Sequence, residues 1–491
     1  MEARPAEAAV TPAAPVAPSD PKAAKRSNFD AYLANAASGS VEASNKPVQL
    51  FLEVSSRCNL RCKKCGFSWD PSLAKNGRDL SWPILARMED FFAAAIEVHT
   101  FGYGEMFLYP ELAPLVTVLK NHGCRTSGIT NGMLIRPADV VWLVATGYDQ
   151  LTFSIDGGTE ATMEKLRGAS LAKVLHVLEL IHQEKERRKS EFPRIVVNFV
   201  AQNDNYHELP ELARQLAPLS IWFMGVNPLH HFVDTVGDYE AYYRNFRLAS
   251  VPKETFGARV AEARAIMEPT GTTFQCFVNP EFEWPVAEPS KDNPVALHNR
   301  TLPEPPKLSE LPTQLATQTT ESAPPSAPPE AAEPAMPEPA AVAVNPETGL
   351  PSMYCHYPWT TLYLSATGKA RVCCYMNVHE DLGEFTGDAS VGTAWNGPAL
   401  RSVREHIRDG RVHRACQQCV AHRTYEVHAA AMHPIRVELG LVPPAAPPEP
   451  EAAAAPAAPP SEAPPAEEVG ILRKMWRRWR APEGDGAGRP L

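Results

Sequence analysis

Three cysteines lie close together in the stretch SSRCNLRCKKCGFSW, residues 55–69. They are Cys58, Cys62 and Cys65, in the spacing C-x3-C-x2-C. A structural zinc site needs four protein ligands, usually as two C-x2-C pairs, and no fourth cysteine or histidine is near. A disulfide would leave one thiol over, and a catalytic thiol would need only one cysteine. A 4Fe-4S cluster held by three thiolates leaves one iron open to a small molecule, so we favour a cluster over zinc.

Six strand-like segments alternate with helix-like segments around these cysteines. This alternation predicts a parallel sheet and, as its simplest closure, a partial β/α barrel with six repeats. Active-site residues of such barrels lie at the C-terminal ends of the strands, and the cysteines directly follow the first strand. The expected strands are 48–54, 98–104, 125–132, 150–156, 194–202 and 221–227.

The expected helices fill the spaces between these strands. One of them is a long amphipathic helix over about 159–189, and Gly123 is a plausible C-cap of an earlier one. The remaining helices are expected at 83–97, 109–123, 137–147 and 208–219.

The sequence CNLRCKKC after a first strand resembles the radical S-adenosylmethionine (radical SAM) superfamily. There the open iron chelates the amino and carboxylate groups of SAM. An electron from the reduced cluster cleaves a C–S bond of SAM, and the 5′-deoxyadenosyl radical so formed abstracts hydrogen from a substrate. The resemblance therefore implies that Cys58, Cys62 and Cys65 are the catalytic cluster ligands and that Phe67 packs near the adenine.

The second strand ends in GYGE, which resembles the G-G-E motif of the superfamily. The resemblance implies that Gly102 and Gly104 let the backbone approach the SAM amino group and that Glu105 accepts from it. The match is degenerate, because Tyr103 displaces the second glycine and Met106 stands where proline is usual.

The resemblance also implies SAM contacts at the ends of later strands. Gly-rich strand ends are usually turns, and Asp156 could simply cap the next helix, so a plain structural interpretation stays open for each. The candidates are Asn131 in TNG (130–132), Ser154 for the carboxylate or ribose, Asp156, Arg167 for the carboxylate, and Asn198 or Gln202 for the ribose.

A second set of cysteines lies near residues 355–419. The segment YLSATGKARVCC predicts a β-hairpin turning at Thr367-Gly368, which would bring Cys355 and Cys373 to one end. Cys416 and Cys419 form a C-x2-C pair after a helix. Spacing alone suits zinc and a 4Fe-4S cluster equally well.

This second set is similar to the SPASM/twitch auxiliary-cluster domains that follow radical SAM barrels. The resemblance implies that Cys355, Cys373, Cys416 and Cys419 ligate one auxiliary 4Fe-4S cluster, for electron transfer or structure. No further cysteine follows Cys419, so the chain resembles a one-cluster version. Cys374 could replace Cys373 as ligand or be a buried thiol, and we favour the buried thiol. The two cysteines without partners by spacing, Cys124 and Cys276, are expected to be buried structural thiols.

Composition divides the 491 residues into folded and low-complexity parts, because the 49 prolines are clustered. Pro/Ala-rich segments cannot bury enough apolar surface to fold. The predicted organisation is a disordered tail (1–45), the radical SAM core (46–285), a Pro-rich disordered spacer (286–350), the auxiliary-cluster domain (351–440), a Pro/Ala linker (441–468) and a basic amphipathic tail (469–491).

The net charge and the composition of the two terminal segments indicate which kinds of partner to expect. A net charge of −10 argues against nucleic-acid binding. Neither a secretory signal nor a run of about 18 apolar residues is present, so we expect a cytoplasmic protein. The stretch GILRKMWRRWR fits a short basic amphipathic helix that could touch an anionic membrane through 469–480, although we favour a solvated tail or a helix that docks back on the barrel.

The sequence thus predicts an α/β radical SAM enzyme with one auxiliary cluster, an unknown substrate (a peptide or protein side chain, or a carbohydrate-like small molecule) and a reductant such as flavodoxin or ferredoxin. The alternative is a non-catalytic iron–sulfur or zinc scaffold that binds a partner, which the degenerate GYGE and the Pro-rich tethers would suit. Turnover of SAM distinguishes the two.

Overall fold

The computed structural model of the chain describes residues 21–69, 77–229, 239–278, 280–284, 355–373, 382–383, 394–409 and 413–416. Within these residues, one sheet has the strand order β7-β6-β5-β4-β3-β2-β1-β8-β9. The strands are β1 (Gln49–Leu52), β2 (Glu97–His99), β3 (Arg125–Thr130), β4 (Gln150–Ser154), β5 (Arg194–Ala201), β6 (Ile221–Pro228), β7 (Thr273–Cys276), β8 (Thr361–Leu364) and β9 (Ala370–Arg371).

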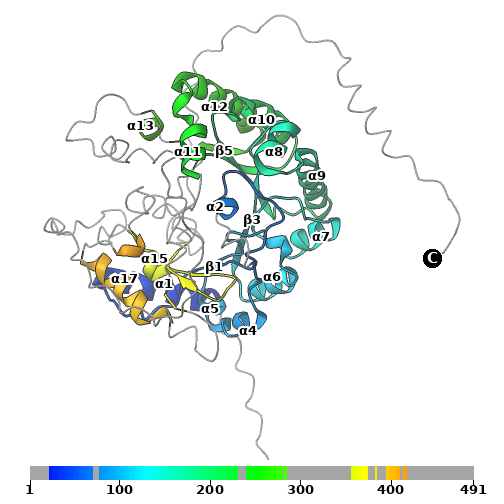
Figure 1. The fold of residues 1–491 in the computed structure, drawn as a ribbon. Coiled ribbons are helices and arrows are strands. Elements are labelled where there is room, and N and C mark those ends of the chain that lie inside the picture. Colours follow the sequence, from blue (N-terminus) through cyan, green and yellow to red (C-terminus); the bar gives the residue numbers. More distant parts are fainter. Residues whose placement is uncertain are drawn as a thin grey trace, which may run out of the picture. The chain divides into compact units, whose positions relative to one another are not determined.

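Strands β1 to β7 are parallel and follow one another across the sheet in chain order. Each consecutive pair needs a crossover, and helices supply it. The sheet curves without closing, with most helices along its outer side (Figure 1). The expected partial β/α barrel with a parallel sheet is confirmed, and β7 adds a strand that the sequence pattern did not indicate.

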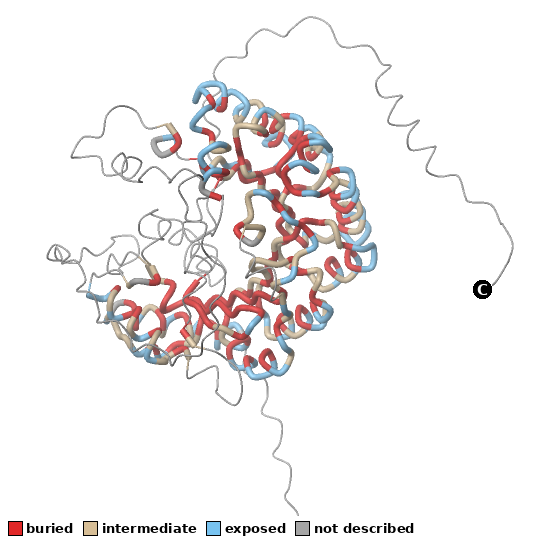
Figure 2. The backbone as a smooth tube through the Cα atoms, in the orientation of Figure 1, coloured by how far each residue is buried: buried red, intermediate tan, exposed pale blue. Residues whose placement is uncertain are grey.

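The helices bury one face against the sheet. In α10, for example, Leu209, Leu212 and Leu216 are fully buried while charged residues face water. Figure 2 shows buried backbone along the strands and exposed backbone on the outer helix surfaces. The helices of the barrel are α2 (Gly66–Trp69), α4 (Trp82–Ala86), α5 (Glu89–Ala94), α6 (Leu112–Asn121), α7 (Pro137–Ala145), α8 (Glu160–Arg167), α9 (Leu171–Arg188), α10 (Leu209–Leu216), α11 (Tyr239–Phe246), α12 (Lys253–Met267) and α13 (Pro280–Glu283).

The prediction of one long helix over 159–189 is wrong, because the segment forms two helices, α8 and α9. Gly168 ends α8 in the left-handed conformation, with φ of +68°. Ser170 then caps α9, its side chain accepting a hydrogen bond from the Lys173 N–H. The segment 83–97 is likewise divided, into α4 and α5. Gly123, with φ of +66°, does terminate α6 as predicted.

The N-terminal segment also differs from its prediction. Residues 21–38 form helix α1 (Pro21–Ser38), so the expectation of disorder through residue 45 is wrong for this part. Phe29, Tyr32 and Ala36, at spacings of three and four, are 1%, 2% and 0% exposed. This apolar face packs against α5 and against the short helix α15 (Tyr357–Thr360).

The cysteine-rich segment continues the barrel sheet. Strand β8 pairs with β1 in parallel, and β9 returns antiparallel to β8. The predicted hairpin turn is present, with Gly368 at φ of +83°. Helix α17 (Pro398–Arg408) follows, and the 3-10 turn η6 (Arg414–Cys416) carries Cys416.

Several predicted regions lie outside the described residues. They are the spacer 286–350, the linker 441–468 and the tail 469–491. Among the helices that the structure does describe, none is long and apolar enough to span a membrane.

Candidate active site at the C-terminal edge of the sheet

The cysteine loop is anchored to the strand ends by backbone hydrogen bonds. The Glu105 N–H donates to the carbonyl of Arg57 (2.8 Å), and the Lys63 N–H donates to that of Leu166 (2.9 Å). The Arg57 side chain also forms an ion pair with Asp79. These bonds place the loop across the C-terminal ends of β1, β2 and β4, where the barrel fold predicts an active site.

The three thiols of this loop are close enough to influence one another. Cys62 is buried, Cys58 and Cys65 are half-buried, and none is in a disulfide. Burial raises the pKa of Cys58 to about 11, and the neighbouring Cys62, Cys65 and Glu105 contribute. Within the described ranges, no three His, Cys, Asp or Glu side chains are grouped to hold a single metal ion.

A buried carboxylate next to the loop binds two cations. Asp156 is fully buried, and its Oδ2 contacts Lys64 Nζ (2.7 Å) and Arg167 Nη1 (2.5 Å). Its Oδ1 accepts from Lys64 Nζ (2.8 Å) and from the Val200 N–H (2.9 Å). Burial alone would raise the pKa of Asp156, but Lys64 and Arg167 hold it below its usual value.

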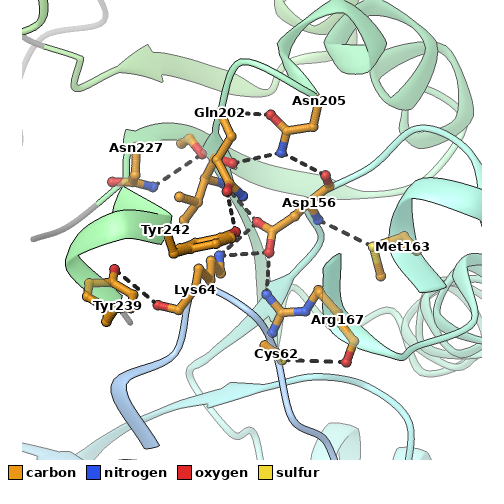
Figure 3. A network of polar contacts seen from close by, with 12 residues as sticks. Cys62, Lys64, Asp156, Met163, Arg167, Gln202, Asn205, Asn227, Tyr239 and Tyr242 are labelled. Carbon is orange, nitrogen blue, oxygen red and sulfur yellow. Dashed lines mark hydrogen bonds and ion pairs between the residues drawn. The ribbon is translucent and has the colours of Figure 1, made fainter. Parts of the chain in front are cut away.

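Arg167 also contacts the cysteines. Its backbone carbonyl lies 3.7 Å from Cys62 Sγ, and its charge is within electrostatic reach of the Cys62 and Cys65 thiols. Figure 3 shows Cys62, Arg167, Asp156 and Lys64 in one continuous network. The Arg167 Nε is buried and has no hydrogen-bond partner among the described residues.

Glu105 is buried at the end of β2 and turned toward the end of β3. Its Oε1 accepts from Thr130 Oγ1 (2.7 Å) and the Phe107 N–H (3.2 Å), and its Oε2 from the Asn131 N–H (2.8 Å). Asn131 in turn donates to Asn59 Oδ1 in the cysteine loop (2.9 Å). The two predicted motifs, GYGE and TNG, are therefore joined directly.

The two glycines of GYGE are required by close packing within the chain. A Cβ on Gly104 would lie 2.1 Å from the Ser55 carbonyl oxygen and 2.6 Å from that of Arg57. A Cβ on Gly102 would lie 2.4 Å from the Glu53 side chain. The loop thus sits directly on the backbone that leads into the cysteines.

The other predicted SAM contacts lie along the same edge. Ser154 and Asn198 are register partners on β4 and β5, and both are half-buried. Gln202 is buried; its Oε1 accepts from the Tyr242 hydroxyl (2.5 Å), and its Nε2 has no partner in the described part of the chain. Phe67 is the second residue of α2, and its side chain is outside what the structure describes.

The second cysteine set is described only in part. Cys355 precedes α15, Cys373 follows β9 and Cys416 ends η6, and none of the three is in a disulfide. Cys374 and Cys419 lie outside the described residues. The four-cysteine ligand set therefore stays a prediction. Of the two unpaired cysteines, Cys124 is buried as expected, whereas Cys276 is half-buried.

Two residues of this region were missed by the sequence reasoning. Lys64 lies between Cys62 and Cys65 in the sequence, and this closeness to two expected cluster ligands was the only sequence feature that could have pointed to it. Glu53 ends the first strand as a charge in an apolar run, which is a signal that could have been used. Its carboxylate is 4% exposed and joins the GYGE loop to the hairpin.

Comparison with known families matches both halves of this arrangement. Residues 52–216 match the family model of the radical SAM superfamily, and residues 355–420 match SPASM, an iron–sulfur cluster-binding domain. The segment 52–216, which holds the three cysteines of the loop, is therefore similar to a radical SAM domain. A radical SAM domain binds a 4Fe-4S cluster and SAM, and a SPASM domain holds an auxiliary iron–sulfur cluster.

Individual relatives are similar to part of this chain. It is 32% identical over 182 residues to the tungsten-containing aldehyde ferredoxin oxidoreductase cofactor-modifying protein of Pyrococcus furiosus, covering 37% of this chain and 51% of that one. It is 31% identical over 124 residues to a PqqA peptide cyclase of Ruegeria pomeroyi, covering 25% of this chain and 32% of the relative. The chain thus spans about half, or less, of these relatives' lengths.

Among solved structures, the chain is similar in fold to SuiB of Streptococcus suis, whose structure was determined bound to the precursor peptide SuiA. That structure has a TM-score of 0.48 and 14% identity, and the match covers 77% of this chain and 71% of that chain.

Proposed function

We propose that this chain is a radical SAM enzyme in which Cys58, Cys62 and Cys65 hold the SAM-binding cluster. The reduced cluster supplies the electron that cleaves SAM to methionine and a 5′-deoxyadenosyl radical, which abstracts hydrogen from the substrate. Three cysteines in one anchored loop, none of them in a disulfide, are the donor set for such a cluster.

The observation that carries the proposal is a pair of buried cations beside the thiols, one of which has an unused hydrogen-bond donor. Two cations, Lys64 and Arg167, share the single carboxylate of Asp156. Buried polar groups normally have hydrogen-bond partners, so a buried donor without one favours a ligand that accepts from it. The unpartnered Arg167 Nε supplies a donor, and a ligand carboxylate such as that of SAM is the group that would use it.

Glu105 retains capacity for the SAM amino group. A carboxylate offers about four acceptor positions, and three are occupied, by Thr130, Phe107 and Asn131. The remaining position belongs to Oε2, which carries only the Asn131 N–H. The degenerate motif therefore keeps the function of its glutamate, while Gly102 and Gly104 serve the packing of the loop.

For the substrate, we propose a peptide or protein side chain, with a carbohydrate-like small molecule as the alternative. The peptide class is supported by the PqqA peptide cyclases among the relatives. The auxiliary cluster, held by Cys355, Cys373, Cys416 and Cys419, would accept an electron or maintain structure. A flavodoxin or ferredoxin would supply the reducing electron.

The test is SAM cleavage by the reconstituted full-length protein. After anaerobic loading with iron and sulfide and reduction with dithionite, 5′-deoxyadenosine is quantified for the parent, Cys62→Ala and Cys276→Ala. We expect nucleoside from the parent and from Cys276→Ala, a cysteine at the end of β7 outside the site, and none from Cys62→Ala. If the parent makes no more than Cys62→Ala with its cluster intact, and SAM does not perturb the cluster spectrum, the scaffold alternative replaces the proposal.

A further inference from the structure

The cysteine motif contains two adjacent lysines with different surroundings. Lys63 is exposed, whereas only 17% of the Lys64 side chain is exposed. The Lys64 ammonium contacts both oxygens of Asp156, at 2.7 and 2.8 Å, and its backbone carbonyl accepts from the Tyr239 hydroxyl at 3.5 Å. The chain therefore folds Lys64 inward and leaves its neighbour in water.

The inward position places a second cation next to the thiols. Lys64 is one residue from Cys65 and two from Cys62, and its charge acts on the Cys62 thiol. Arg167 alone would be sufficient to neutralise Asp156. With Lys64 added, two cations contact the one carboxylate of Asp156, and Arg167 is also within electrostatic reach of the buried Glu105 carboxylate.

We propose that Lys64 sets the reduction potential of the cluster that Cys58, Cys62 and Cys65 hold. This inference rests on the proposed function only insofar as those thiols bind a cluster. Reduction adds negative charge, and a cation fixed nearby stabilises the reduced state; the charge around a cluster is one determinant of its potential. Asp156 keeps the cation beside the thiols by accepting from the Lys64 ammonium through its side-chain oxygens.

The magnitude follows from Coulomb's law. One charge about 10 Å away, at an effective dielectric constant of about 20, changes an equilibrium constant by roughly tenfold. For a one-electron couple, tenfold corresponds to about 59 mV. Loss of the Lys64 charge should therefore make the potential more negative by about that amount.

The experiment is a redox titration of the reconstituted full-length protein, followed by electron paramagnetic resonance in the absence of SAM. The variants are Lys64→Met, the matched control Lys63→Met and the charge-conserving Lys64→Arg. We expect a tenfold less favourable reduction in Lys64→Met alone, with Lys63→Met and Lys64→Arg near the parent. A signal from the auxiliary cysteines serves as an internal reference and should not move.

A fourth variant fixes the sign. Asp156→Asn removes a negative charge but keeps an amide oxygen that can accept from Lys64 Nζ. Both cations then stay in place, and the potential should become more positive, opposite to that of Lys64→Met. A purely structural role for Lys64 would lower iron content without these opposed shifts. Equal potentials for the parent, Lys64→Met and Asp156→Asn would overturn the proposal. If Lys64→Met fails to hold its cluster, then a potential of Asp156→Asn equal to that of the parent would by itself overturn the proposal. None of these readouts requires SAM cleavage, so they separate this inference from the proposed activity.

Discussion

The side-chain carboxylate of Glu53 accepts a hydrogen bond from the backbone N–H of Ala366, 313 positions later in the chain, at 3.1 Å. Its other oxygen accepts from the Tyr103 N–H at 2.8 Å. One buried side chain therefore joins the GYGE loop of the barrel to the hairpin that leads into Cys373. Burial raises the pKa of Glu53, against the effect of these two N–H donors.

Glu53→Gln should loosen this connection. An amide has one acceptor oxygen, so one of the two buried N–H groups loses its partner, at a cost of about 1–3 kcal/mol in the free energy of unfolding. Denaturant unfolding measures the loss, and amide hydrogen exchange at Tyr103 and Ala366 locates it. Glu89→Gln is the control, since that side chain is 77% exposed. Identical stability and exchange in the two variants would show that Glu53 does not connect the segments.

Gly104→Ala should prevent the cysteine loop from adopting its conformation. The new Cβ would lie 2.1 Å from a backbone oxygen, which no side-chain adjustment can relieve. We expect a large loss of bound iron and a lower melting temperature. Gly257→Ala, in α12, has no atom within 4 Å of its new Cβ and should instead stabilise the helix by about 1 kcal/mol. Normal iron binding in Gly104→Ala would contradict the close packing described here.

The ion pairs of Asp156 should make the free energy of unfolding depend on pH in the acidic range. Because its folded-state pKa is lowered, the unfolded chain takes up the proton first as pH falls. The stabilisation is therefore complete above the ordinary Asp pKa and is lost as pH falls through the lowered value. The free energy of unfolding should be measured against pH for the metal-free parent and Asp156→Asn. The difference between the two should be largest near neutrality and should begin to shrink below about pH 4. Parallel curves would refute the ion-pair assignment.

Removal of residues 1–38 should destabilise the fold although this region looks disordered in composition. The deletion takes away α1 and the buried Phe29 and Tyr32. Loss of even one buried aromatic side chain costs about 3–5 kcal/mol, so the melting temperature should fall clearly. Removal of residues 1–20 is the matched control. Equal melting temperatures of the two truncations would mean that α1 contributes nothing to the fold.

The sequence predicted the features that depend on local pattern. The six strands have a regular alternation with helices, and their order across the sheet follows from parallel crossovers. The Cys58, Cys62 and Cys65 spacing predicts a cluster chemistry by itself. The hairpin turn at Gly368 and the C-cap at Gly123 follow from the need for a positive φ.

The features that the sequence did not predict depend on tertiary contacts. Helix α1 has a weak apolar pattern and is buried only because α5 and α15 cover it. The pairing of β8 with β1 joins residues that are hundreds of positions apart, which no local periodicity records. Lys64 resembles its exposed neighbour in sequence, and its inward position depends on contacts with distant residues such as Asp156, which lies just after β4.

The central claim is that three thiols, not four, hold the barrel cluster and leave one iron open to SAM. Mössbauer spectroscopy of the iron-57-reconstituted protein, with and without SAM, tests this most directly, with Cys62→Ala as control. We predict that SAM changes the signal of one iron in one cluster of the parent, and nothing in the variant. Identical spectra with and without SAM in a parent whose barrel cluster is intact would contradict the account.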